Sequence, residues 1–179
     1  MLLDLSQMRG THDRFDRTYE PSAFGLANEE YVIARPVRLA LDVYKNKKEV
    51  RLVGQVATVL QLECGRCVEP FDLPVEAAFD LRYLPHSKNV GEGEVEIEEG
   101  DLDTAFYRDD VIDLGQLMRE QFYLALPMKP LCQDACRGLC PRCGTNLNQS
   151  TCDCARTWVD PRLEVLRTLG PKEGNEEEQ

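Results

Sequence analysis

Residue types on which enzymes and membrane proteins depend are scarce in this sequence. Histidine occurs only at His12 and His86, both in polar surroundings, so we expect a surface role for each. There is no glycine-rich phosphate loop and no nucleophile elbow. No apolar run reaches the length of a membrane span, and residues 1–10 lack the pattern of a signal peptide. We therefore expect a cytoplasmic protein with neither a membrane partner nor a small-molecule substrate.

Basic residues are in the minority. Lysine and arginine number 21 against 32 acidic residues, which gives a net charge of −11. Residues 88–110 carry nine acids against two basic residues, and residues 171–179 carry four against one. Because binding to a nucleic-acid backbone needs a basic face, a basic protein is the easier electrostatic match. The alternative, that the acidic segment is only a solvated loop, stays open.

Hydrophobic periodicity predicts a sheet followed by helices. Alternating apolar and polar residues predict strands at 37–45, 49–62, 73–84 and 103–107. A hairpin turn joins the first two strands, and an acidic loop precedes the last. Asp113 and Gln116 have the spacing of a capping box, and the predicted helix that follows ends before Pro127. A last helix is expected from Pro161, with Asp160 as its N-cap.

Eight cysteines are the strongest chemical signal. They are Cys64, Cys67, Cys132, Cys136, Cys140, Cys143, Cys152 and Cys154. Without a secretory signal, disulfides are not expected, and metal ligation is the next interpretation. Two thiolates on one tetrahedral zinc ion lie about 3.8 Å apart, a spacing that a two-residue turn such as Cys140-Pro-Arg-Cys143 delivers. Gly144 then lets the backbone fold back without a side-chain clash.

These cysteines suffice for two closed four-sulfur sites. The preferred grouping places Cys140, Cys143, Cys152 and Cys154 in one site, and Cys64, Cys67, Cys132 and Cys136 in a second site that would clamp the sheet to the C-terminal module. The other grouping joins 132, 136, 140 and 143, and it stays open. So do an iron–sulfur cluster, and a free or redox-active thiol pair at 64 and 67. Closed sites with two-residue knuckles favour two structural Zn²⁺ ions and no metal catalysis.

An ordered series of short motifs carries a family resemblance. The series is Cys64-Gly-Arg-Cys67-Val-Glu-Pro-Phe, Leu73-Pro-Val, Ile112-Asp-Leu, Arg119-Glu-Gln-Phe-Tyr-Leu-Ala-Leu-Pro-Met-Lys-Pro-Leu-Cys132, Gly138-Leu-Cys-Pro-Arg-Cys-Gly-Thr-Asn-Leu-Asn148 and Asp160-Pro-Arg-Leu163. Over roughly residues 30–170 the chain resembles the bacterial YceD family of large ribosomal RNA subunit accumulation proteins. The resemblance implies a role in synthesis, processing or stability of 23S ribosomal RNA, and a gene often placed beside one for a large-subunit ribosomal protein. It also implies that some relatives lack the Cys140–Cys154 cluster, which favours the preferred grouping.

We therefore expect an α+β protein with a small antiparallel β-sheet, C-terminal helices and a Cys-rich zinc module at about 128–156. Residues 1–170 would form a single YceD-like domain, and 171–179 a disordered acidic tail. The predicted function is that of a non-enzymatic zinc-binding factor in large ribosomal subunit biogenesis. Its partner would be a large-subunit ribosomal protein, another basic protein or a pre-ribosomal particle, with an indirect contact to 23S ribosomal RNA.

Two alternatives belong to other functional classes. The first is a direct RNA-binding zinc protein that uses five arginines around the zinc module, at Arg137, Arg142, Arg156, Arg162 and Arg167. The second and weaker one is a ribosomal RNA-processing enzyme with its site on the acidic segment.

Overall fold

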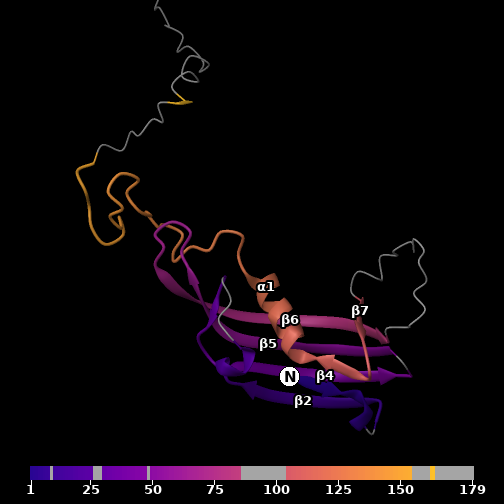
Figure 1. Cartoon of the computed structure of the whole chain (residues 1–179). Coiled ribbons are helices and arrows are strands. Elements are labelled where there is room, and N and C mark those ends of the chain that lie inside the picture. Colours follow the sequence, from indigo (N-terminus) through magenta and orange to yellow (C-terminus); the bar gives the residue numbers. More distant parts are fainter. Residues whose placement is uncertain (9, 26–29, 48, 86–103, 155–161, 164–179) are drawn as a thin grey trace, which may run out of the picture. The chain divides into compact units, whose positions relative to one another are not determined.

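The computed structural model describes residues 1–8, 10–25, 30–47, 49–85, 104–154 and 162–163 (Figure 1). The strands are β1 (Leu2–Asp4), β2 (His12–Tyr19), β3 (Val32–Ile33), β4 (Val37–Asn46), β5 (Glu49–Glu63), β6 (Pro70–Pro85), β7 (Thr104–Tyr107) and β8 (Val111–Asp113). Among these residues the α-helix is α1 (Leu114–Ala125), and short 3-10 turns cover Leu5–Gln7 and Pro21–Phe24. Of the last helix predicted from Pro161, only residues 162–163 are described, and the tail 171–179 lies outside the described residues.

The chain divides into two compact units. The first comprises residues 1–65 and 69–132, and it holds every strand named above together with α1. The second comprises residues 66–68 and 133–179, and its described part consists of turns and extended segments. None of the helices in the described part of the chain is long and apolar enough to cross a membrane.

A six-stranded sheet forms the frame of the first unit. Its order is β2-β4-β5-β6-β7, with β3 also pairing with β5. The strands predicted from periodicity correspond to β4, β5, β6 and β7, which confirms that part of the prediction. One pair departs from the predicted antiparallel pattern, because β7 runs parallel to β6. Strand β2 is not predicted, since Asp13 and the exposed Arg17 alternate with the half-buried Phe15 and Tyr19 and the apolar pattern is therefore weak.

The two faces of the sheet differ in polarity because side chains alternate along each strand. In β4 the positions Val37, Leu39, Leu41 and Val43 are buried, whereas the intervening Arg38 and Tyr44 are exposed. Helix α1 covers the apolar face (Figure 1), and its buried positions are Leu114, Leu117, Met118 and Phe122. Burying one such side chain contributes about 1.5–3 kcal/mol, so this face holds the unit together.

Gly54 allows the two central strands to approach closely. It pairs with Leu41 on the apolar face of the sheet. A Cβ atom at this position would overlap the Ala40 carbonyl oxygen and the Leu41 backbone. Since backbone atoms cannot move aside as a flexible side chain can, a residue without a side chain is required here.

The N-terminus of α1 follows the predicted cap. The Asp113 carboxylate accepts hydrogen bonds from the backbone N–H groups of Gly115 at 2.8 Å and Gln116 at 3.2 Å. The Gln116 side chain donates to Glu120 at 2.9 Å, one turn further along the helix. The N-cap is therefore confirmed, whereas the Gln116 side chain takes a different partner from the one that a capping box implies.

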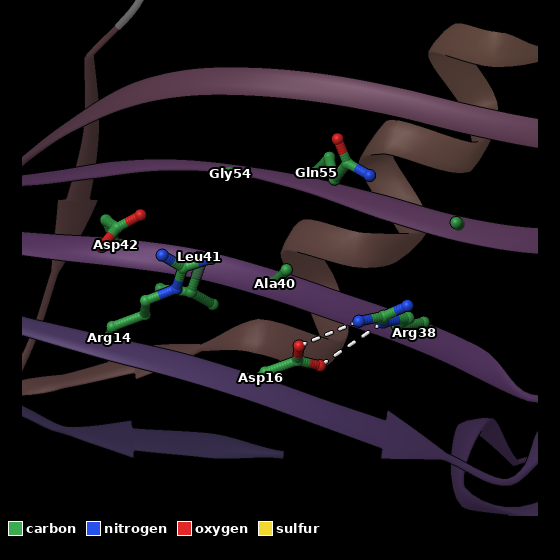
Figure 2. A pocket seen from close by; sticks show the side chains of 9 residues that line it. Arg14, Asp16, Arg38, Ala40, Leu41, Asp42, Gly54 and Gln55 are labelled. Atoms are coloured by element: carbon green, nitrogen blue, oxygen red, sulfur yellow. Dashed lines mark hydrogen bonds and ion pairs between the residues drawn. The ribbon is translucent and has the colours of Figure 1, made fainter.

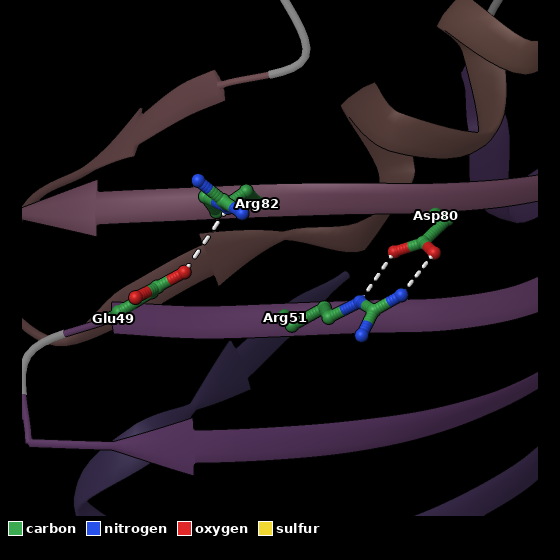
Figure 3. A network of polar contacts seen from close by, with 4 residues as sticks. All are labelled: Glu49, Arg51, Asp80 and Arg82. Carbon is green, nitrogen blue, oxygen red and sulfur yellow. Dashed lines mark hydrogen bonds and ion pairs between the residues drawn. The ribbon is translucent and has the colours of Figure 1, made fainter. Parts of the chain in front are cut away.

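The face of the sheet opposite α1 carries ion pairs between neighbouring strands. Arg51 pairs with Asp80, and Arg82 pairs with Glu49 at 3.1 Å (Figure 3). These side chains are about half exposed, so water screens the pairs and they contribute little to stability. Their effect is to keep the charges of this face balanced.

Candidate metal centres

The first two-residue knuckle lies in the connection from β5 to β6. Cys64 follows the last residue of β5, and its backbone N–H donates to the Glu69 carbonyl at 3.0 Å. Cys64 and Cys67 are 1% and 4% exposed. Val68, which follows the second cysteine, has φ 61°. A β-branched residue in the left-handed region is an outlier, so the surrounding structure must impose this conformation.

The second knuckle, at Cys140 and Cys143, has the same local fold. The Cys140 backbone N–H donates to the Thr145 carbonyl at 2.8 Å, which repeats the Cys64 to Glu69 spacing of five residues. The Gly144 N–H donates to the Cys140 carbonyl at 2.9 Å. Gly144 follows the second cysteine and has φ 73°, the conformation that Val68 adopts in the first knuckle. The chain therefore forms the same turn twice, once with glycine and once with valine at its strained position.

The structure brings the eight sulfur atoms together in two sets. One set comprises Cys64, Cys67, Cys132 and Cys136, and the other comprises Cys140, Cys143, Cys152 and Cys154. Within each set all four sulfur atoms lie within 4.8 Å of one another. This is the grouping preferred from the sequence. Because four thiolates around one zinc ion lie about 3.8 Å apart, the sulfur atoms of each set are close enough together to hold one metal ion.

Hydrogen bonds stabilise negative charge on the 140–154 set. The Thr145 hydroxyl, 3.1 Å from the Cys143 sulfur, and the Thr145 backbone N–H lower the pKa of the Cys143 thiol to about 6. Backbone N–H groups of Cys143 and Arg142 lower the pKa of the Cys140 thiol. The Cys143 side chain raises the pKa of the Cys154 thiol to about 12. Cys140 and Cys143 are thus stabilised as thiolates, the form that ligates metal, whereas the raised pKa values of Cys152 and Cys154 mean that these two would lose their protons only when a bound cation offsets the mutual repulsion.

Asn148 supports the segment around Cys136. Its side-chain amide donates to the Cys136 sulfur at 3.3 Å, and its carbonyl oxygen accepts from the Arg137 backbone N–H at 2.8 Å. In the same unit the Arg66 guanidinium donates to the Cys136 carbonyl at 2.9 Å. Bonds of this kind orient metal ligands. Asn148 and Arg66 lie within the motifs of the family resemblance, but the sequence alone assigns neither a role. No fixed sequence spacing marks an amide or guanidinium that supports a metal ligand.

The other predicted functional residues are only partly described. Arg137 and Arg142 are exposed, and the acidic Asp134 and Asp153 of the same unit are exposed as well. Arg162 is also exposed. Arg156, Arg167, His86 and residues 88–103 of the acidic segment lie outside the described residues. His12 is on the surface, where its ring pairs with Asp42 at 2.8 Å and stacks on Tyr44.

A hollow of about 370 Å³ on the polar face of the sheet offers no better chemical site. Figure 2 shows its rim, where Arg38 pairs with Asp16 at 3.0 Å. Its floor consists of small residues from β4 and β5, among them Ala40 and Gly54. None of the residues that line it forms a nucleophile with an adjacent base. The two cysteine sets are therefore the candidate site.

Comparisons with known proteins show the family of this chain. The profile of the family "Large ribosomal RNA subunit accumulation protein YceD" matches residues 52–170, a range that contains all eight cysteines. The chain therefore belongs to the YceD family. No solved structure matches it.

Three relatives show how far the similarity extends. A protein of Arabidopsis thaliana named "Large ribosomal RNA subunit accumulation protein YCED homolog 1, chloroplastic" is 32% identical over 162 residues, covering 79% of this chain and 50% of the relative. An uncharacterized Mycobacterium tuberculosis protein is 31% identical, covering 88% and 73%. The uncharacterized YlbN of Bacillus subtilis is 25% identical and covers 94% of both chains. The chain thus spans about half the length of the Arabidopsis relative.

Proposed function

We propose that this chain is a non-enzymatic, zinc-stabilised factor that supports accumulation of 23S ribosomal RNA during large-subunit biogenesis. The observation that carries the proposal is the family match over residues 52–170, which contains both four-cysteine sets. The plant relatives are named for accumulation of the large ribosomal RNA subunit.

Each cysteine set would hold one Zn²⁺ ion. Four sulfur donors, two of them on a tight knuckle, match the closed tetrahedral sites of structural zinc. A bound ion would act as a crosslink within the fold, and it would leave no open position for a substrate or a water molecule. Cys64, Cys67 and Cys136 are almost fully buried, whereas Cys143 is exposed. The two sites should therefore differ in how readily a chelator reaches them.

A basic protein is the favoured partner. The net charge of −11 opposes phosphate, and two zinc ions do not compensate eight thiolates. Within the second unit, the exposed Asp134 and Asp153 offset the exposed Arg137 and Arg142 in net charge. Binding of naked RNA should accordingly be weak. Tight, salt-sensitive binding of the purified protein to naked 23S fragments would support direct RNA recognition instead.

The metal part is tested by metal analysis and thiol titration of anaerobically purified protein. We expect two zinc ions per chain and no disulfide. Removal of zinc with a chelator should destabilise the second unit, because structural metal binding is coupled to folding. A zinc content below one, or a brown protein containing iron, would contradict this assignment.

The cellular part is tested by complementing a deletion strain. Wild-type protein should restore the 23S to 16S ratio, whereas a variant with Cys64→Ser and Cys67→Ser should not. Ser150→Ala, an exposed change in the second unit, serves as the control. An unchanged ratio in the deletion strain, in both cold and warm growth, would remove the ribosomal function.

A further inference from the structure

A groove in the first unit combines exposed apolar side chains with carboxylates. It has a volume of about 390 Å³ and lies among β7, β8 and the first two turns of α1. Leu2 and Phe106, which line it, are 66% and 60% exposed. Large apolar side chains that are this exposed to solvent are typical of interaction surfaces when they line the same hollow. Leu117 also lines the groove but is only 1% exposed, so Leu2 and Phe106 are the large apolar side chains that a partner can reach.

The polar lining of the groove is acidic. Glu120, Asp113 and Tyr83 line it, and because Asp113 already caps α1 and lies 3.8 Å from the Met1 amino group, Glu120 is the carboxylate that a partner can engage. Burial, together with the charges of Glu120 and Asp113, raises the pKa of the Tyr83 phenol to about 12. The Tyr83 hydroxyl therefore interacts electrostatically with both carboxylates and stays protonated at neutral pH. Arg108 supplies the opposing charge in the lining.

The turn beside the groove adds to this negative potential. Asp109 and Asp110 join β7 to β8, and both have positive φ, at 54° and 56°. Two aspartates occupy positions where glycine or asparagine would be less strained. They outnumber Arg108, so the potential at this end of the first unit is negative. Such a surface repels phosphate and attracts Lys or Arg side chains.

We propose that this groove binds a segment of the partner protein in which a Lys or Arg lies next to a large apolar residue. The apolar side chain would pack against Leu2 and Phe106, and the cation would lie at Glu120. This inference rests on the proposed function, because it specifies the surface that the basic partner occupies. It goes beyond that function in naming one groove and the chemistry of the segment that fills it.

Site-specific photo-crosslinking in cells tests the location. Benzoylphenylalanine replaces Phe106, whose ring it resembles, and in a matched strain it replaces Tyr44, which is 45% exposed on β4 and does not line the groove. We expect a protein crosslink from position 106 and none from position 44. The crosslinked peptide should carry Lys or Arg within two residues of a large apolar side chain. A crosslink to RNA, to a second copy of this chain or to an acidic peptide, or no crosslink, would overturn the proposal.

Charge reversal then tests the chemistry with the crosslinked segment as a synthetic peptide. Its binding to the full chain is measured by fluorescence anisotropy. Glu120→Lys should weaken binding about tenfold, and Glu120→Gln less, with both effects reduced at high salt. Phe106→Ala should also weaken binding about tenfold, with little dependence on salt. Glu76→Lys makes the same charge change at an exposed β6 position outside this groove, and it should change binding less than twofold. Equal losses from Glu76→Lys and Glu120→Lys would refute recognition in the groove.

The ribosomal RNA ratio separates the two levels of the proposal. If deletion lowers 23S but the combination of Phe106→Ala and Glu120→Lys restores a normal ratio, the groove inference fails and the proposed function stands. If deletion leaves the ratio unchanged, the proposed function fails whatever the crosslink shows.

Discussion

Replacing the residue after the second cysteine of each knuckle tests whether the left-handed backbone conformation there costs free energy. Val68 and Gly144 occupy equivalent positions with φ 61° and 73°. The left-handed conformation costs a residue with a Cβ atom about 1–2 kcal/mol relative to glycine. A Cβ atom added at Gly144 would have no neighbour within 4 Å, so a loss of stability there would be conformational and not steric.

We therefore expect Gly144→Ala to weaken zinc binding at its knuckle by about five- to thirtyfold, the equivalent of about 1–2 kcal/mol. At the other knuckle Val68→Gly should bind zinc more tightly than Val68→Ala by a similar factor. The comparison with alanine removes the contribution of the lost valine methyl groups. Asparagine, which tolerates this conformation, should lie between glycine and alanine at both positions.

Competition with a chromophoric chelator at constant pH measures these affinities. Gly65→Ala is the matched control, because Gly65 lies inside the first knuckle but has no positive φ, and a Cβ atom there would make only an ordinary contact with Pro130. It should leave zinc affinity unchanged or slightly improved. If the order of variants follows side-chain size or hydrophobicity, with no advantage for glycine and asparagine, the strain argument is wrong.

Four further predictions follow from the first unit and the acidic segment. Gly54→Ala should destabilise the sheet by several kcal/mol in urea titrations, since its Cβ would overlap the Ala40 backbone; an effect below about 1 kcal/mol would contradict the close approach. Asp113→Ala should cost about 1 kcal/mol, and Asp113→Asn, which keeps a side-chain acceptor, much less. The pKa of Tyr83 is about 12 in the folded protein and about 10 in the unfolded chain. Its contribution to the free energy of unfolding is therefore fully present below pH 10, and about 2–3 kcal/mol is lost as the pH rises to 12. Tyr83→Phe should remove this part of the loss of stability, which denaturation at pH 9 and pH 11 measures. Replacing five glutamates of the acidic segment with glutamine should slow association with the basic partner at low salt without changing the unfolding midpoint, and an unchanged association rate would show that the segment is only solvated. The five are Glu92, Glu94, Glu96, Glu98 and Glu99.

The elements that depend on local periodicity were predictable from the sequence. Alternation of apolar residues such as Leu39, Leu41 and Val43 marks β4, and comparable patterns mark β5 and β6. The cap at Asp113 and the stop before Pro127 bound α1. These features are determined over a few residues, because a strand face repeats every second residue and a cap acts within one turn.

The sequence by itself also determined the donor chemistry, because it supplies eight thiols, with two pairs on two-residue knuckles. It left open which pairs share a set, because the partners of Cys64 and Cys67 lie more than sixty residues further along the chain. Tertiary structure decided that grouping, the parallel pairing of β7 with β6, and the groove that joins Leu2 to Phe106 and Glu120. It also placed Val68 in a conformation that a β-branched residue avoids on its own. The common reason is that each of these features depends on contacts between distant segments, and neither periodicity nor residue propensity carries information about such contacts.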